Sequence, residues 1–334
     1  MPETPQPIRM AMYGTKHAHA LGVLSVMLAN PDVEVAGVYE PDRARRDVLT
    51  KSGGGPWSLI SWLDDPADIL DDPHIVAVAS EGDNAESLAH TEAIVEAGKH
   101  VFYDKPAGED LPRFERVLAR AKEQSLLVQM GYMFRYNDGF ARIADWARSG
   151  FLGNVYSVRA HMSTNIGADS HARVAQHGGA ILFDLGGHVL DQIVWILGRP
   201  QKITSFLRTE FSVTPGFVDN SIAVLEFDRA SAIVDIAAME PKPAARRFEV
   251  YGDGGSAILE PMEPATTLRL CLPEARGGYP EGVSTVQLNA SPRYVAGLAA
   301  FIEDIRGTKT PDRSLDHEFL VQETLLRATG TVDG

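Results

Sequence analysis

Short apolar runs and amphipathic segments alternate through the first 134 residues of the chain. The runs are continuous, as in strands that are buried on both faces of a sheet, and they lie at 8–13, 33–40, 74–80, 99–108 (with the exit from the strand) and 126–134. Leucine, isoleucine and valine recur at helical spacing between them. We therefore expect an α/β fold in which residues 1–134 form a Rossmann-like domain. Its doubly wound parallel sheet would bind a ligand at the carboxyl ends of the strands.

The pattern changes after residue 134. Between residues 201 and 285, strand-like runs follow one another without a helix between them. Residues 135–334 are therefore predicted to form an α+β domain with a large, mainly antiparallel sheet, and its helices are expected near 137–153, 178–198, 292–306 and 316–329. Helices on one face leave the other face uncovered, which predicts a homodimer or homotetramer formed through this sheet.

The segment 178–198, GGAILFDLGGHVLDQIVWILG, is the most informative of these helices. Asp184 and His188 are one helical turn apart, so a carboxylate and an imidazole share one face. Such a pair is common on half-buried helices and by itself indicates acid–base chemistry only weakly. The glycine pairs 178–179 and 186–187 lower helix stability relative to alanine, which favours the interpretation that they make room for a ligand.

The turn after the first apolar run carries part of a dinucleotide-binding pattern. Gly14 follows the run and Glu40 ends the next strand, but Lys16 and His19 stand where a G-x-G-x-x-G fingerprint has its second and third glycines. The following helix would present its N-terminus to a pyrophosphate. Lys16 or His17 would contact phosphate or be a solvated turn residue, and the sequence leaves both readings open.

The acidic residue at position 40 bears on which cofactor is bound. Glu40 would accept hydrogen bonds from the ribose hydroxyls and repel a 2′-phosphate, which favours NAD. Arg43 lies nearby, so NADP stays as the alternative.

Asp104, Lys105 and Pro106 follow another predicted strand. A lysine in a strand-exit loop is usually exposed at the surface. The carboxyl end of a central strand, however, is where ligands bind in sheets of this type. The proline restricts Lys105 to an extended conformation and permits a cis bond.

Composition excludes several classes of partner. The formal net charge is −14 and no run of Lys or Arg occurs, which argues against nucleic acid and anionic membranes. The single cysteine, Cys271, cannot form an internal disulfide and fits a reducing compartment. No apolar run approaches the ~18 residues of a membrane helix, and the opening MPETPQP has no signal-peptide pattern. We expect a cytoplasmic protein.

Several segments match one known family. EAGKHVFYDKPAG resembles a strand that leads to a Glu-Lys-Pro motif, with Asp104 in place of the glutamate. The 178–198 helix resembles a Gly-Gly-(x)3-Asp-x-Gly-x-His-(x)2-Asp motif, and YMFRYN, SGFLGNVYSV and GDGGSAILE match connecting segments. On these motifs the chain resembles the Gfo/Idh/MocA family of nicotinamide-dependent oxidoreductases, which act mostly on sugars, cyclitols and related polyols.

The resemblance implies that Lys105, Asp184 and His188 are catalytic. His188, with a reference pKa of ~6.5, would accept the hydroxyl proton while hydride leaves for the nicotinamide. Lys105 would hold the hydroxyl and stabilise alkoxide charge, and Asp184 would orient the sugar or the imidazole.

The resemblance also implies the binding residues. NAD, with NADP as the alternative, would contact Gly14, Lys16, His17, Glu40 and Lys105. Arg135 and Asn137 would either line the substrate cleft or form a salt-bridged domain hinge. Substrate hydroxyls would be bound by His161, His177 and Arg173, with His177 favoured because it adjoins Gly178. A small sugar or polyol is the expected partner, and no metal is expected.

Three other functions compete with a net dehydrogenase. Transient oxidation with tightly held NAD would give a glycoside-cleaving or epimerising enzyme. A non-catalytic dinucleotide-binding scaffold or sensor is a second alternative. A metal-dependent amidohydrolase barrel would use His17, His19, His161 and His188 with Lys105, but that fold needs eight strand–helix units, which 201–285 does not supply.

Overall fold

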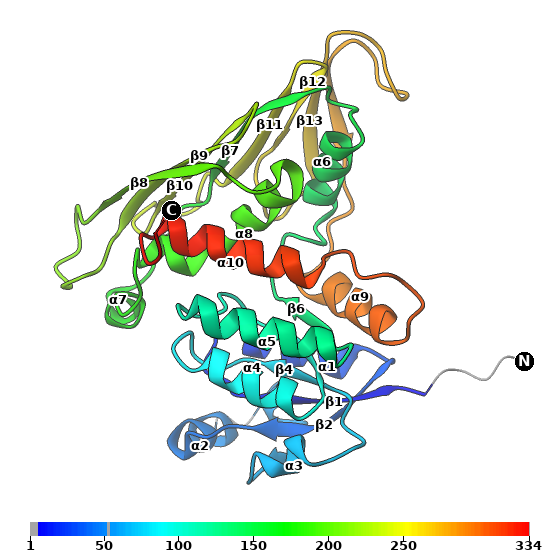
Figure 1. Cartoon of the computed structure of the whole chain (residues 1–334), viewed down its shortest axis with the longest axis vertical. Coiled ribbons are helices and arrows are strands. Elements are labelled where there is room, and N and C mark those ends of the chain that lie inside the picture. Colours follow the sequence, from blue (N-terminus) through cyan, green and yellow to red (C-terminus); the bar gives the residue numbers. More distant parts are fainter. Residues whose placement is uncertain (1–5, 52–53, 334) are drawn as a thin grey trace, which may run out of the picture. The chain divides into compact units, whose positions relative to one another are not determined.

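The computed structural model describes residues 6–51 and 54–333 (Figure 1). The opening residues 1–5, in which no signal peptide was predicted, lie outside the described residues, as do residues 52–53 of the turn that follows the second predicted helix. The chain forms two compact units, Met1–Gly131 with Pro292–Phe319, and Tyr132–Ser291 with Leu320–Gly334. Residues 292–319 therefore pack with the first unit, although they lie late in the sequence. The division of the chain into domains at residue 134 stays a prediction.

The first unit contains a six-stranded parallel sheet with the order β3-β2-β1-β4-β5-β6. The order reverses between β1 and β4, and ligands of open α/β sheets bind at such a switch point. This confirms the predicted Rossmann-like sheet. Its strands are β1 (Ile8–Tyr13), β2 (Val33–Tyr39), β3 (Trp62–Leu63), β4 (Ala77–Ser80), β5 (His100–Tyr103) and β6 (Val128–Met130).

Helices connect these strands and cover the sheet. They are α1 (Ala20–Ala29), α2 (Arg43–Lys51), α3 (Ala67–Leu70), α4 (Ser87–Glu96) and α5 (Leu111–Glu123), with a 3-10 helix η1 at Pro56–Ser58. A later helix, α9 (Val295–Ile305), also belongs to this unit. Its apolar side joins the core of the sheet, where Phe301 packs edge-on against Phe102 of β5 with ring centroids 5.7 Å apart. Burial of this apolar side explains why α9 groups with the first sheet.

The second unit contains an eight-stranded sheet with the order β14-β13-β12-β11-β7-β10-β9-β8. All neighbours are antiparallel except β7 and β10, so the predicted mainly antiparallel sheet is confirmed. The strands are β7 (Val155–His161), β8 (Lys202–Arg208), β9 (Asn220–Glu226), β10 (Ser231–Ala237), β11 (Arg247–Gly252), β12 (Gly255–Leu259), β13 (Thr267–Leu272) and β14 (Gly282–Gln287).

The helices of this unit are α6 (Asp138–Arg148), α7 (Ala168–Val174) and α8 (Ile181–Leu197), and α10 (Leu315–Ala328) begins in the first unit and ends in the second. Helix α8 packs against β9 and β10. The segment of α7 shows no clear apolar periodicity, since Val174 is the one residue of this helix that is buried. Arg173 lies on the exposed side of α7.

The sheet of the second unit carries apolar side chains on both faces. Ala223 and Val234 are fully buried on one face. The alternate residues Phe206, Ile222 and Ile233 are 58%, 40% and 38% exposed on the other. No helix in the described part of the chain is long and apolar enough to cross a membrane.

Candidate active site

Three strands of the first sheet end at the same level. Tyr13, Ser80 and Tyr103 are register partners on β1, β4 and β5, so the residues that follow them meet at one edge of the sheet. Gly14 has a φ of +82°, and a Cβ there would lie 2.9 Å from the backbone of Gly82. Only glycine fits this turn without strain.

Glu40 follows β2 at the predicted position and is buried. One of its carboxylate oxygens accepts from the Thr15 amide at 2.8 Å and from the Thr15 hydroxyl at 2.5 Å, and the other accepts from the Asp42 amide at 2.9 Å. Glu40 therefore holds the turn after β1 in place. Its contact with a ribose stays a prediction.

Two basic side chains lie at the same turn. Lys16 Nζ is 3.3 Å from a carboxylate oxygen of Glu86, in a partly exposed pair that contributes little stability. Arg45 donates from Nε to the Thr15 hydroxyl at 2.7 Å and from a terminal nitrogen to the Thr15 carbonyl. The sequence pointed to Arg43 for discrimination between NAD and NADP, whereas Arg45 is the guanidinium that reaches this turn.

His17, His19, Glu81 and Asp104 form a buried cluster at the strand ends. Nδ1 of His17 and Nδ1 of His19 each lie 3.0 Å from the same oxygen of Asp104. Burial lowers the pKa of His19, and Asp104 offsets this only in part. Burial raises the pKa of Asp104, but the two imidazoles outweigh it and hold that pKa well below its ordinary value. Burial, and then the charge of Asp104, raises the pKa of Glu81 well above its ordinary value.

Lys105 directly follows this cluster. The residue is only 3% exposed, unlike a surface lysine, and its amide donates to Asp104 at 2.7 Å. The bond to Pro106 is cis, as the sequence permitted. The structure therefore gives Lys105 the buried strand-end position that a ligand-binding lysine requires.

In the second unit, α8 carries the predicted Asp184 and His188. His188 is buried against two aromatic rings, with its centroid 6.2 Å from that of Tyr132 and 5.7 Å from that of Phe134. Asp184 lies one turn earlier and is partly exposed. An imidazole that lies on a helix and packs against aromatic rings is positioned rigidly, as proton transfer requires.

The glycines of α8 serve packing, which corrects the prediction that they make room for a ligand. A Cβ on Gly187 would lie 2.9 Å from the Tyr132 ring, and one on Gly186 would lie 3.2 Å from the Leu325 side chain. Gly179 precedes the helix with a φ of +69°, and its Cβ would lie 2.8 Å from Thr329. Side chains of the protein itself fill the space that these glycines leave.

The predicted cleft residues Arg135 and Asn137 have structural partners. Arg135 forms a buried ion pair with Asp191 of α8, with nitrogen and oxygen 2.7 Å apart. Asn137 caps α6 by accepting from the amides of Gly139 and Phe140. For Arg135 this geometry favours the salt-bridge alternative over the substrate contact.

His161 and His177 differ in position. His161 pairs in register with Asp235 and Arg247, and its ring nitrogens lie 3.0 Å from Asp235 and 3.3 Å from Glu240. It therefore shares the sheet face of Asp235 and Ile222, opposite to the face that α8 covers.

His177 is buried before α8, and its ring stacks on Phe183 with centroids 4.7 Å apart. Of the two histidines, His177 is the one that lies next to α8, the helix that carries His188.

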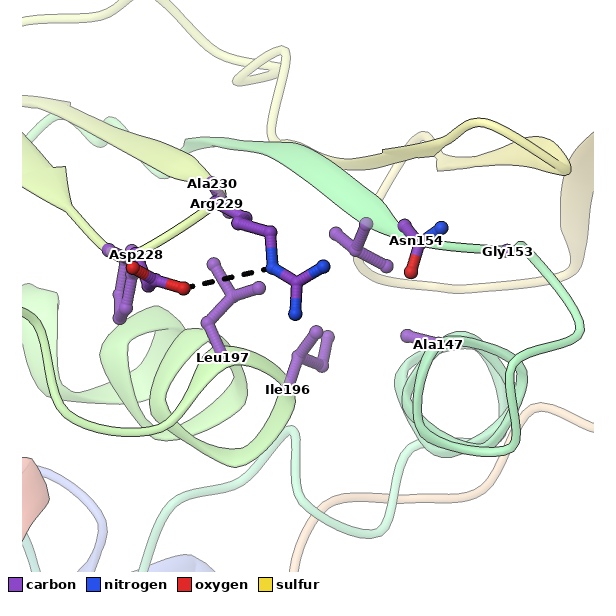
Figure 2. A pocket seen from close by; sticks show the side chains of 10 residues that line it. Ala147, Gly153, Asn154, Ile196, Leu197, Asp228, Arg229 and Ala230 are labelled. Atoms are coloured by element: carbon purple, nitrogen blue, oxygen red, sulfur yellow. Dashed lines mark ion pairs between the residues drawn. The ribbon is translucent and has the colours of Figure 1, made fainter.

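A pocket of about 310 Å³ lies at the end of α8 (Figure 2). Leu197 and Ile196 line it together with Ala147 of α6 and the turn between β9 and β10. Ile196 is eight residues beyond His188, about 12 Å along the helix axis. Among the residues that line the pocket, Arg229 and Asp228 form an ion pair at 3.7 Å, and both side chains are more than four-fifths exposed. The pocket is therefore separate from the part of α8 that carries His188.

The amidohydrolase alternative is wrong, because the strands form an open six-stranded sheet and an eight-stranded sheet rather than a barrel. A doubly wound sheet with a glycine turn at its switch point defines a dinucleotide-binding protein. The chain matches the family model for the oxidoreductase family with an NAD-binding Rossmann fold over residues 8–132. It matches the model for the GFO/IDH/MocA C-terminal domain over residues 140–258.

Known proteins resemble the chain over most of its length. It is 25% identical to scyllo-inositol 2-dehydrogenase (NAD(+)) of Bacillus subtilis, over 91% of this chain and 88% of that protein. A putative NADPH-dependent oxidoreductase from Desulfitobacterium hafniense has a similar fold, with a TM-score of 0.84, 16% identity and coverage of 98% and 96%. A 3-ketoreductase from Actinomadura kijaniata in complex with NADP also has a similar fold, with a TM-score of 0.78, 20% identity and coverage of 97% of each chain.

The chain belongs to the Gfo/Idh/MocA family of oxidoreductases. It binds a nicotinamide dinucleotide through its first unit. The expected class, an NAD(P)-dependent dehydrogenase acting on CH–OH groups, is confirmed.

Proposed function

We propose that the protein interconverts a secondary alcohol and a ketone on a sugar, cyclitol or related polyol, with NAD as the preferred cofactor. The B. subtilis relative is an inositol dehydrogenase, and the A. kijaniata protein is a ketoreductase. The names describe dehydrogenation of an inositol and reduction of a ketone. The observation that carries the proposal is the buried imidazole of His188 on α8, which packs against two aromatic rings.

The residues at the strand ends fit a dinucleotide. The turn at Gly14 brings the backbone of β1 close to that of β4, and no side chain caps the N-terminus of α1. The first amides of α1 therefore suit a pyrophosphate. Lys16 is held only by partly exposed carboxylates and can turn to phosphate. Gly14, Lys16, His17, Glu40 and Lys105 are the proposed cofactor-binding residues.

Bound NAD would accept the hydride, and side chains of this protein would accept and hold the proton. His188 accepts the hydroxyl proton as general base. Lys105 donates a hydrogen bond to the same oxygen and stabilises the charge that develops on it. Asp184, one turn from His188 on α8, orients a substrate hydroxyl or the imidazole. His177 lies before the same helix and is the proposed contact to a further hydroxyl.

A ligand screen tests this function. Thermal shift against NAD, NADP and a polyol panel that includes scyllo-inositol should raise the melting temperature, more with NAD than with NADP, because bound ligand stabilises the native state. Turnover with the polyol that stabilises the protein should release NADH. Product formation without net NADH would instead support transient oxidation with retained NAD. Absence of any dinucleotide effect on melting would contradict the proposal.

We also propose a homodimer or homotetramer formed through the open face of the eight-stranded sheet. Phe206, Ile222 and Ile233 expose large apolar side chains on that face, and such patches are typical of protein interfaces. Light scattering at micromolar concentration should give at least twice the mass of one chain, and a monomer would contradict this interface. The cytoplasmic location remains a prediction.

A further inference from the structure

The cluster of His17, His19, Glu81 and Asp104 lies wholly within the first unit. The two histidines come from the turn between β1 and α1, while Glu81 and Asp104 directly follow β4 and β5. The His17 amide donates to the Glu81 carbonyl at 3.0 Å, which fixes the histidine turn to the end of β4. Backbone contacts therefore hold the four side chains at the switch point of the sheet.

The ligand-type atoms of this cluster converge. Nδ1 of His17 and Nδ1 of His19 each lie 3.0 Å from one oxygen of Asp104, and the donor atoms of the three residues all lie within 4.8 Å of one another. Tetrahedral bonds of about 2.1 Å from a transition metal to nitrogen or oxygen put neighbouring ligands about 3.4 Å apart. The two distances to Asp104 are on this scale, and rotation of the side chains would bring any wider pair of donors onto the same ion.

Nδ1 of His17 lies at the centre of two contacts. It is 3.2 Å from the amide nitrogen of His19 and 3.0 Å from an oxygen of Asp104. This nitrogen has one lone pair, so a metal ion bound to it would replace the contact with the His19 amide. Without an ion, a proton on Nδ1 joins His17 to Asp104.

Glu81 provides an independent observation. The residue is 0% exposed, and neither of its carboxylate oxygens has a hydrogen-bond partner in the described part of the chain. One of these oxygens lies 3.9 Å from Nδ1 of His17. A buried carboxylate without donors is costly unless a proton or a metal ion satisfies it.

We propose that His17, His19 and Asp104 bind a divalent transition-metal ion, with Glu81 as a fourth ligand. Two imidazoles and a carboxylate suit Zn²⁺, Fe²⁺ or Co²⁺, whereas Mg²⁺ and Ca²⁺ prefer oxygen ligands throughout. All four proposed ligands belong to the first unit, so the proposal of a metal site is independent of the proposed substrate.

Four protein ligands close a tetrahedral site, so an outside ligand would enter as the fifth ligand of the ion. Asp104 adjoins Lys105 and accepts its amide hydrogen. The fifth position would therefore bind an oxygen of substrate or cofactor near Lys105. His17 would then reach the cofactor only through the ion, and Lys16 with the first amides of α1 would remain for the pyrophosphate.

Metal titration of the full chain tests the proposal. After chelator treatment, isothermal titration with Zn²⁺ should show one saturable site per chain, Mg²⁺ should show none, and Co²⁺ should give the visible absorption of nitrogen and oxygen ligation. His19→Gln and Asp104→Asn should each weaken Zn²⁺ binding by at least ~100-fold, since loss of an outer-shell partner alone costs 10- to 100-fold. Glu81→Gln should weaken it less.

Two control variants separate this site from adventitious binding. His74→Gln changes an exposed histidine of the same unit, and His161→Gln changes another histidine that lies against two carboxylates. Both should bind Zn²⁺ like the wild type. No saturable Zn²⁺ site on the wild-type chain would overturn the proposal whether or not the variants fold. Unchanged affinity in both folded ligand variants would also overturn it and leave a shared proton as the explanation of the cluster.

Discussion

His188→Gln lowers kcat by about 10²- to 10⁴-fold, the range that removal of a general acid–base costs, and leaves the affinity for NAD unchanged. Glutamine forms hydrogen bonds and is similar in length to histidine, so it can pack against Tyr132 and Phe134 in the same place. It cannot accept a proton at neutral pH. The dinucleotide belongs to the first unit and His188 to the second. Steady-state kinetics with the identified polyol, together with NAD titration, measure both quantities.

The matched control changes the same residue type outside the site. His74→Gln, at an exposed position of the first unit, should keep the wild-type kcat and KM. Full activity of His188→Gln would remove His188 from the mechanism and strengthen the scaffold alternative.

Arg135→Met lowers the free energy of unfolding by about 3–5 kcal/mol, the cost of leaving one partner of a buried ion pair alone. The side chains of Arg135 and Asp191 are 1% and 0% exposed, so solvent cannot replace the lost guanidinium. Replacing both residues, as Arg135→Met with Asp191→Leu, should recover much of the loss. Denaturant unfolding monitored by circular dichroism measures each variant.

An exposed pair of the same unit is the control. Arg229 pairs with Asp228 in the turn between β9 and β10, where the two side chains are 87% and 83% exposed, and Arg229→Met should cost less than about 1 kcal/mol. If Arg135→Met instead keeps wild-type stability and raises the KM for the polyol, Arg135 contacts substrate and the ion pair is incidental.

Elements with strong periodicity were predictable. The strands of the first sheet are continuous apolar runs, and five of the six stand close to their predicted positions. The parallel pairing of β7 with β10 was not predictable, because register depends on which strands become neighbours. Helix α9 has a clear apolar side, but such a side does not show which sheet it will cover.

The candidate site was predictable only where one motif contained it. Asp184 and His188 lie on one helix, so their spacing predicted that they share a face, while their proposed catalytic role came from the family motif. The packing role of Gly187 depends on Tyr132, which is 55 residues earlier in the sequence, and no local pattern reveals that contact. Glu81 was missed although it directly follows a buried strand, as Asp104 does. Its relation to His17 appears only once the strand order places β4 between β1 and β5.

A crystal structure of the protein with NADH and the polyol that its turnover identifies tests the central claim most directly. The account predicts that Nζ of Lys105 and a ring nitrogen of His188 both lie about 3 Å from the same substrate hydroxyl, whose carbon faces the nicotinamide. Lys105 and His188 on opposite sides of the bound substrate, or either one out of reach of that hydroxyl, would contradict it.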